Sequence, residues 1–186
     1  MAGLNALSDL FQNELRDVYD AEKQILKALP KMAKAAGNEE LREMFQTHLE
    51  ETQNQVQRLE QIFESLDLKP RGKHCAGMAG IIEEGKELLE EDGEDSVLDA
   101  GFVAAAQRVE HYEITAYGSL MAWAKLLGYN EALQLLQQNL AEEKATDKKL
   151  SALAESSVNR QAAAAGEEVE EEAPAPRPKV RAAGRR

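Results

Sequence analysis

Apolar side chains recur every three to four residues along four long stretches of the chain, and glycine and proline are nearly absent from these stretches. This spacing is the period of an α-helix, and the stretches lack the alternation that is typical of strands. Gly37 and Asn38 suit a helix end and a helix cap, so they mark a short turn between the first two stretches. The pattern predicts long helices over about residues 4–36, 38–66, 97–127 and 130–157.

Short turns join the first helix to the second and the third to the fourth, so each pair is expected to form an antiparallel hairpin. Between the hairpins, Pro70, Gly72, Gly77 and Gly80 break the pattern, and one shorter helix is expected over residues 78–91. Two hairpins joined by a long crossover are a standard connection of a four-helix bundle. The sequence therefore predicts an all-α fold, a four-helix bundle with a short extra helix in its crossover.

The apolar stripe of each long helix is interrupted near its middle by residues that can bind metal ions. Glu22 stands on the first stripe between Val18 and Ile25, and Glu110 and Glu113 stand three residues apart on the third. A carboxylate belongs on a core face only if something pairs with it. Residues equally far from a hairpin turn lie at similar heights in antiparallel helices, so we expect the interruptions to meet in one layer. The predicted metal ligands are Glu22, His48, Glu51, Glu110, Glu113, Glu143 and Asp147.

These ligands indicate which ions the layer would hold. Six acidic residues buried together would repel one another and raise their pKa values unless cations neutralised them. Hard oxygen ligands with one imidazole favour iron or manganese over copper or structural zinc. Bundles of this class hold metal ions with ligands that face inward from all four helices. We therefore expect two iron ions as the cofactor, with manganese as the alternative.

Other polar residues near the stripes have simpler explanations. Glu14 and Asp17 lie just off the first stripe and suit the surface or positions around the ligands. His111 follows Glu110 but points about 100° away from it around the helix, which favours a solvent or interface position. Tyr117 either packs in the core or acts near the ligands as a hydrogen-bond donor or an electron relay.

The formal charge of −12 argues against nucleic acid as a partner and makes small cations the natural ligands. The single cysteine, Cys75, cannot form an internal disulfide, and its pair with His74 lacks the spacing of a zinc site. No apolar run is long enough to span a membrane, and the start of the chain does not resemble a signal peptide. These features predict a cytoplasmic protein.

The composition changes near Val158. The residues that follow are first acidic, then rich in proline and then basic, and they include almost no large apolar side chain. Such a segment cannot bury enough apolar surface to offset the entropy lost on ordering. We therefore expect a bundle domain over residues 1–157 and a disordered tail over residues 158–186.

Several strings carry a family likeness: "AEKQILKALPKMAKAAGNEEL", "HLEETQNQVQRLEQIF", "AAQRVEHYEITAYGSL" and "LAEEKATDKKLSALAE". In order and spacing they resemble the YciF/YciE family of ferritin-like proteins, bacterial proteins associated with stress responses. The resemblance covers about residues 5–157. It implies a ferritin-like bundle, a dinuclear iron-type site, a homodimer and a role in stress.

The chain departs from the wider ferritin and rubrerythrin superfamily at two helices. The second helix carries His48-x-x-Glu51 in place of Glu-x-x-His, and the fourth carries Glu143 and Asp147 four residues apart. A site richer in carboxylates favours higher oxidation states of the bound metal ions. It therefore argues against assigning the peroxidase activity of rubrerythrin directly to this chain. By analogy with that superfamily, Glu22 and Glu143 would be terminal ligands of opposite metals, and Glu51 and Glu113 would bridge them.

Two functions are consistent with these features. The first is a stress-related di-metal protein whose carboxylate-bridged site reacts with oxygen or peroxide, as an oxidase or peroxidase would. The alternative is a non-catalytic, metal-binding or stress-protective bundle that forms a dimer. Measuring turnover separates them. Iron storage in a ferritin-type cage is less consistent with the long tail and the crossover helix.

Overall fold

The computed structural model describes residues 3–172, with side chains described up to residue 166. All regular structure in this part of the chain is helical, which confirms the predicted all-α class. The predicted order of two hairpins with a shorter helix between them is also confirmed, and most helix ends agree within a few residues. The helices are α1 (Leu7–Ala35), α2 (Glu39–Ser65), α3 (Ala76–Glu90), α4 (Asp95–Leu127), α5 (Asn130–Leu153), the π-helical turn η1 (Ala154–Val158) and α6 (Asn159–Glu172).

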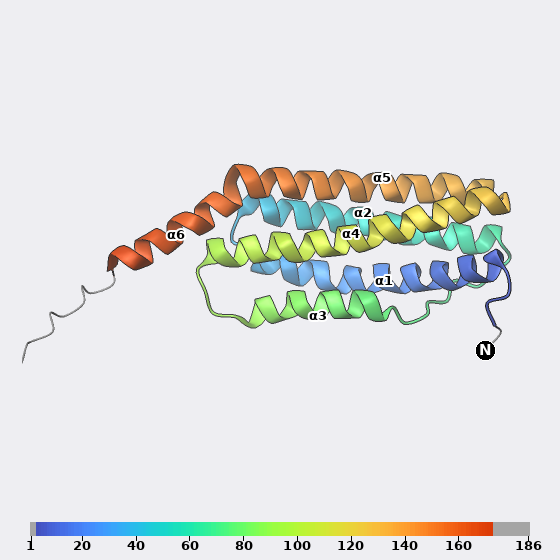
Figure 1. Cartoon of the computed structure of the whole chain (residues 1–186), viewed down its shortest axis with the longest axis horizontal. Helices are drawn as coiled ribbons and strands as arrows, with labels where there is room; N and C mark the ends of the chain where they lie inside the picture. Colours follow the sequence, from blue (N-terminus) through green and yellow to red (C-terminus); the bar gives the residue numbers. More distant parts are fainter. Residues whose placement is uncertain (1–2, 173–186) are drawn as a thin grey trace, which may run out of the picture.

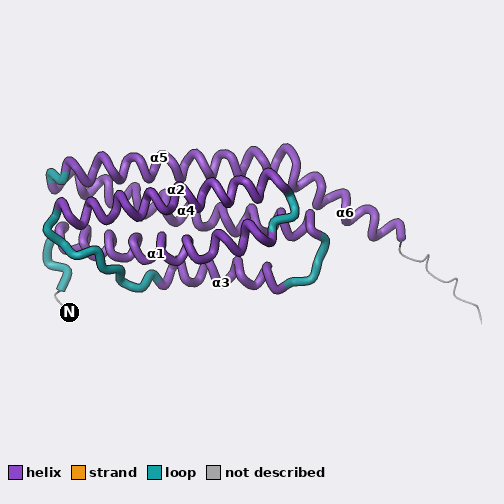
Figure 2. Tube along the Cα trace, turned by 180° about the vertical axis from the view of Figure 1, so that it is seen from behind, coloured by secondary structure: helices purple, strands orange, loops and turns teal. Residues whose placement is uncertain are grey.

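The four long helices run side by side and form a ferritin-like bundle (Figure 1). Helix α1 packs against α2 and α4, and α5 packs against α4 and α2, so the two hairpins close around a shared core. Helix α3 lies along α1 and α4 on the outside of this bundle, as Figure 1 shows. Seen from behind in Figure 2, a long loop leads from α2 back to the start of α3. Among the described helices, none combines the length and the apolar character that a membrane crossing requires.

Local sequence explains the turns that set the helix register. The Asn38 side chain accepts a hydrogen bond from the Leu41 amide at 3.0 Å, which caps α2. At the other hairpin, Gly128 ends α4 with a φ of 72°, a left-handed conformation that glycine adopts without strain. The buried Asp99 carboxylate on α4 accepts bonds from the amides of Gly37 and Asn38 at 2.9 and 2.7 Å. This contact fastens the first hairpin turn to α4.

The core has two apolar clusters with a polar layer between them. One cluster lies toward the α1–α2 turn and includes Ile25 and Phe45, and the other lies toward the α4–α5 turn and includes Leu15 and Leu136. Buried polar side chains from all four long helices separate the clusters. We call them the polar layer: Glu22, His48, Thr52, Gln55, Glu110, Glu113, Asn139, Glu143 and Thr146.

The structure differs from the expected disordered tail in its first part. The chain stays helical through η1 and α6, α6 packs against α4, and Val158 is fully buried in the core. Four successive alanines, 162–165, explain the helix because alanine has the highest helix propensity. Figure 1 shows α6 extending beyond the end of the bundle. The Pro-rich and basic remainder of the predicted tail, residues 173–186, lies outside the described residues.

Candidate metal centre

Four buried side chains of the polar layer converge in the middle of the bundle. His48 comes from α2, Glu110 and Glu113 from α4, and Glu143 from α5, and each offers a ligand atom within 4.8 Å of the others. A metal ion bound at about 2.0–2.2 Å needs donor atoms up to about 4.4 Å apart, so small side-chain shifts would suffice. Every one of these side chains is no more than 3% exposed. The group could therefore hold a metal ion.

Glu22 extends this group toward α1. Its carboxylate is fully buried and accepts a hydrogen bond from the Tyr117 hydroxyl through Oε1. Burial, followed by repulsion from the charge on Glu143, raises the pKa of Glu22 to about 8. The charge of Glu22 also contributes to the raised pKa of Glu113. Glu22 is therefore close enough to interact electrostatically with both Glu113 and Glu143. Glu22 thus lies beside the central group, at the height that its distance from the hairpin turn predicts.

Most of these potential ligand atoms have no hydrogen-bond partner among the described residues. A buried carboxylate oxygen or imidazole nitrogen without a partner is costly, and native proteins rarely retain many of them. In the polar layer they are concentrated in one place, and their chemistry is that of metal donors. The unpartnered atoms are Glu22 Oε2, both ring nitrogens of His48, Gln55 Oε1, Glu110 Oε2, both oxygens of Glu113, and Glu143 Oε2.

The electrostatics of the metal-free group are unfavourable for charged carboxylates. Burial, and then the charge of Asp147, Glu22 and Glu51, raise the pKa of Glu110 to about 8, although a hydrogen bond with Glu143 opposes the shift. Burial is also the largest cause of the strongly raised pKa values of Glu113 and Glu143. Protons would therefore occupy several of these carboxyl groups near neutral pH. A cation would replace those protons and satisfy the same oxygens.

His48 links the centre of the group to its edge. Its Nε2 lies 3.3 Å from Glu110 Oε1, and its Nδ1 lies 3.6 Å from Glu51 Oε2. Burial alone would lower the pKa of His48, but the contact with Glu51 and the charges of Glu143 and Glu22 outweigh it and raise the pKa. The Thr52 hydroxyl donates to the His48 carbonyl at 2.8 Å. The imidazole is therefore surrounded by carboxylates that would share a cation with it.

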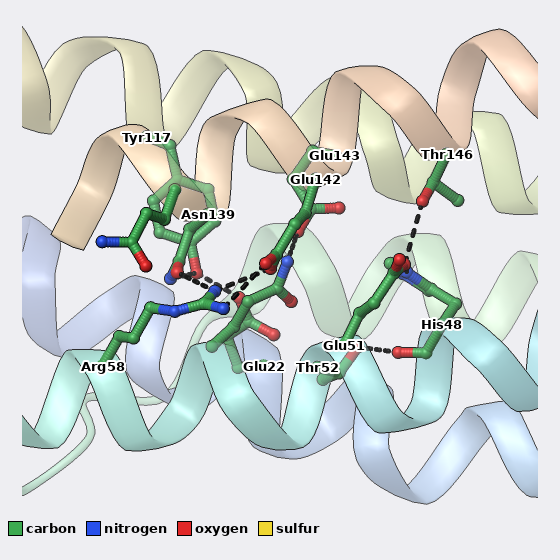
Figure 3. Close-up of polar contacts among 12 residues, drawn as sticks. Glu22, His48, Glu51, Thr52, Arg58, Tyr117, Asn139, Glu142, Glu143 and Thr146 are labelled. Carbon is green, nitrogen blue, oxygen red and sulfur yellow. Dashed lines mark hydrogen bonds and ion pairs between the residues drawn. The ribbon is translucent and has the colours of Figure 1, made fainter. Parts of the chain in front are cut away.

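Glu51 lies at the margin of the group, not in its centre. Its side chain is 26% exposed, and its Oε2 accepts a hydrogen bond from the Thr146 hydroxyl at 3.2 Å. The contact with His48 lowers the pKa of Glu51, so this carboxylate stays charged where its buried neighbours do not. Figure 3 shows Glu51, His48 and Thr146 together on one side of Glu143. A direct ligand role for Glu51 stays a prediction.

Asp147, like Glu51, lies at the margin of the group and outside its four converging side chains, and its role as a ligand stays a prediction. Its Oδ1 lies 3.3 Å from His111 Nε2 and accepts from the Gln107 amide at 3.2 Å, near the surface between α4 and α5. The physical reason is helix register. The step from Glu143 to the next core-facing side chain is three residues, which selects Thr146, and not four, which would select Asp147. His111 itself is 70% exposed and pairs with Asp147.

A chain of hydrogen bonds outside the ligands orients the carboxylates. The Gln55 amide donates to Glu143, and the Asn139 amide donates at 3.0 Å to the Tyr117 hydroxyl, which in turn donates to Glu22. Arg58 donates to Asn139 at 2.8 Å and holds both oxygens of Glu142 at 2.7 Å (Figure 3). Such partners fix the orientation of metal ligands. Tyr117 therefore acts as a hydrogen-bond donor to one of the predicted ligands, which is one of the two roles that the sequence suggested for it.

Sequence reasoning missed Gln55, Asn139 and Thr146 as parts of the site. Gln55 was visible as a polar interruption of the α2 stripe, one turn beyond Glu51. Asn139 precedes Glu143 by four residues and Thr146 follows it by three, so both share its helix face. Their shared helix face with Glu143 is the sequence signal that could have identified Asn139 and Thr146.

The fold and the polar layer together define the class: a ferritin-like helical bundle with a buried histidine and glutamate group that could hold a metal ion. The chain belongs to the DUF892 family, a domain of unknown function, which it matches over residues 6–163. It is 47% identical over 160 residues to Protein YciF of Escherichia coli strain K12, covering 86% of this chain and 96% of YciF. The predicted likeness to the YciF/YciE family is confirmed.

Solved structures agree with this assignment. The crystal structure of the E. coli stress protein YciF superposes with a TM-score of 0.80 at 47% identity, covering 83% of this chain and 98% of that one. YcfI from Rhodopseudomonas palustris is described as a candidate structural protein. It superposes with a TM-score of 0.78 at 48% identity, covering 80% of this chain and 94% of that one. A protein from Xanthomonas campestris pv. campestris superposes with a TM-score of 0.65 at 23% identity, covering 89% of this chain and 99% of that one. This match supports the fold alone.

Proposed function

We propose that this protein binds two iron ions in its polar layer, with manganese as the alternative, and reacts with oxygen or peroxide there. The observation that carries the proposal is the buried group of His48, Glu110, Glu113 and Glu143, whose unpartnered donor atoms lie within reach of one cation. Glu22 beside them supplies the additional carboxylate that a second ion would need. Hard oxygen donors with a single imidazole suit iron or manganese.

The donors divide naturally between two ions. His48 and Glu110, 3.3 Å apart, would hold one ion, and Glu22 on α1 would hold the other. Glu113 and Glu143, the other two buried carboxylates of the group, would complete the set of ligands. Glu51 at the margin and Asp147 near the surface remain proposed ligands of lower rank, because each has polar contacts outside the central group.

Bound iron would supply the electrons for the reduction of oxygen or peroxide. The chain's own residues would prepare the site by holding and releasing protons. With pKa values of about 8, Glu22 and Glu110 keep protons near neutral pH in the metal-free protein and must release them when a cation binds. Tyr117 and Gln55 then keep donating to Glu22 and Glu143, which fixes the oxygens that face the ions.

The relatives extend the proposal to a biological role. A YciF relative is described as a stress protein, and we carry that role to this chain as a response to oxidants in the cytoplasm. A homodimer is part of the same proposal, since the family resemblance implies one.

The test begins with protein purified without a metal-chelating column. Metal analysis after anaerobic loading with ferrous iron should return two ions per chain, and exposure to oxygen or peroxide should produce a ferric absorbance band. Manganese loading on the same samples ranks the two metals. Absence of bound metal after anaerobic loading would overturn the proposal.

The second candidate is a non-catalytic bundle stabilised by its metal. The observation in its favour is that the donors come from all four long helices, so an ion bound there would tie both hairpins together. The description of the R. palustris relative as a candidate structural protein is consistent with this alternative. Under this alternative, metal raises the melting temperature, yet oxygen and peroxide are consumed no faster than by free ferrous iron.

A further inference from the structure

A cavity of about 260 Å³ adjoins the polar layer and is lined by residues of α1, α2, α3, α4 and α5. Its buried lining residues include His48, Glu110 and Thr146, which belong to that layer. Between this inner end and the surface the walls are formed by aliphatic side chains, among them Ile25 and Ile82. The cavity therefore joins the protein surface to the candidate metal centre along an apolar path.

The exposed side chains that line the cavity are lysines. The exposed residues in its lining are Lys27 and Lys31, one turn apart on α1, and Lys86, which faces them from α3. Lys86 also lies 3.2 Å from Glu83, whose charge it partly neutralises. The charges of Glu87 and Glu90 also act on Lys86, so the positive charge at the opening rests mainly on Lys27 and Lys31. Such an opening favours an anionic group.

Small residues create the space inside the cavity. Ala28 on α1, Gly85 on α3, and Ala105 and Ala106 on α4 all line it. A Cβ placed on Gly85 would lie 3.6 Å from the Ala105 Cβ, so α3 and α4 approach closely along this wall. The volume is at the lower end of the range for small-molecule sites, which is about 300–1,000 Å³. This size suits one aliphatic chain better than a ring system or a large cofactor.

We infer that this cavity binds a medium-chain aliphatic carboxylic acid, with its carboxylate at Lys27, Lys31 and Lys86 and its alkyl tail directed toward His48 and Glu110. The opposite orientation would bury the carboxylate away from water and leave the end of the alkyl tail among the exposed lysines. An amine would meet the lysines unfavourably at the opening. The inference does not depend on the proposed redox chemistry, although a bound tail would end beside that centre.

The experiment is calorimetric titration of metal-free and metal-loaded protein with octanoate, decanoate and dodecanoate below their micelle concentrations. Affinity should rise about fourfold with each added methylene until the cavity is full. Decanol and decylamine keep the tail and change the head group, and both should bind more weakly than decanoate. If decanol or decylamine binds as tightly as decanoate, the assignment of an acid is wrong.

Two pairs of variants locate the site. Lys27→Gln with Lys31→Gln should weaken decanoate binding about five- to tenfold, whereas Lys23→Gln with Lys34→Gln, which removes the same charge from exposed positions of α1, should not. Ala106→Leu fills the cavity and should weaken binding at least about tenfold. Its control is Ala104→Leu, the same change at an exposed position of α4. Parental affinity in both the lysine and the Ala106 variants would overturn the inference.

Other outcomes are equally decisive. If Ala106→Leu does not fold, the lysine variants and the head-group series still test the site. If none of the three acids binds to either the metal-free or the metal-loaded protein, the inference fails. Metal uptake measured on the same samples separates the proposals: uptake of two ions without acid binding removes only this inference, and acid binding without uptake removes only the metal site.

Discussion

The polar layer and a second, half-buried polar cluster differ in whether their atoms find partners within the protein. We call the second cluster the crossover junction: Asp17, Asp20, Cys75 and Tyr112. There the Cys75 thiol lies 2.9 Å from the Tyr112 hydroxyl, which donates to Asp17 at 2.8 Å. Asp20 accepts from the Cys75 amide at 2.9 Å. These contacts fasten the start of α3 to α1 and α4, and they explain the isolated cysteine without a metal.

The polar layer has the opposite character. Glu113 has no hydrogen-bond partner for either oxygen, and His48 has none for either nitrogen, among the described residues. The pKa values show the same contrast: that of Asp20 is lowered because its hydrogen bonds with the Cys75 amide and Gln24 outweigh its burial, while that of Glu113 is strongly raised. A buried polar cluster that satisfies itself is structural. One that leaves donor atoms facing each other requires an additional ligand, and here a cation fits.

The largest expected effect comes from removing the charge of Glu113. Glu113→Gln keeps the side-chain shape but removes a buried carboxylate from the centre of the proposed ligand group, so oxygen-dependent oxidation of iron should be abolished. In the metal-free protein the raised pKa of Glu113 keeps its carboxyl group protonated near neutral pH, so the neutral glutamine should leave the melting temperature nearly unchanged. Metal stoichiometry, oxidation rate and thermal unfolding measure these effects.

The control for this change is Glu14→Gln, on α1. Glu14 is half-buried, and its pKa is raised by burial and then by Asp17, but it lies outside the polar layer. It should retain two ions and the parental oxidation rate. Retention of both by Glu113→Gln would show that Glu113 has no role at the centre.

Metal removal should give the next largest effect. A ligand that binds only the folded protein adds about 4 kcal/mol of stability at a free concentration a thousand times its dissociation constant. For a domain of this size that corresponds to a melting temperature about 10 °C higher with iron than without. Thermal unfolding with and without a chelator measures the difference. A shift unchanged by Glu113→Gln would mean that the metal binds elsewhere.

The pH dependence of the metal-free protein provides a third comparison. Glu22 and Glu110 have folded-state pKa values of about 8, above their ordinary value of 4.5. At pH values below the pKa of the unfolded state, a group of this kind makes its full contribution to stability. That contribution is lost as the pH rises through the pKa of the folded state. The melting temperature should therefore fall by about 5–10 °C between about pH 5 and pH 8.5.

Bound metal should remove most of this slope, because a cation takes the place of the protons. Matched unfolding curves at each pH, with and without metal, test the expectation. Metal affinity should rise over the same interval as the carboxyl groups lose their protons. A metal-free protein that is most stable above pH 8 would contradict the raised pKa values.

Much of the fold was predictable from sequence because each helix carries its own periodic signal. The stripe that includes Glu22 and Ile25 identified the buried face of α1, and Gly37 and Asn38 identified the first turn. Burial of His48, Glu110, Glu113 and Glu143 in one group agrees with the interrupted stripes. Local spacing was sufficient wherever the register of a helix was unambiguous.

The remainder depended on tertiary contacts that spacing cannot specify. On α5, steps of three and four residues from Glu143 are both helical, and packing chose Thr146 over Asp147. At the end of the bundle, Val158 is buried only because η1 continues α5 into the core. The link between Cys75 and Tyr112 joins residues far apart in sequence, and no local pattern marks it.

The smallest effect should come from Tyr112→Phe, which tests the crossover junction. The change removes the hydroxyl that lies between the Cys75 thiol and Asp17, so about 1–2 kcal/mol of stability should be lost. The melting temperature should fall by a few degrees, equally with and without metal. Two ions should still bind and react with oxygen at the parental rate, even though Tyr112 directly precedes Glu113 in the chain.

Tyr129→Phe is the matched control for Tyr112→Phe, because the Tyr129 ring packs edge-on against Phe11 at 5.4 Å, away from the junction. It should keep nearly the full parental melting temperature. If Tyr112→Phe instead lowers metal affinity or slows iron oxidation, the junction influences the centre through α4, and the two polar clusters are coupled. If Tyr112→Phe has no effect on stability, the junction's hydrogen bonds contribute little, and packing of α3 alone holds the crossover in place.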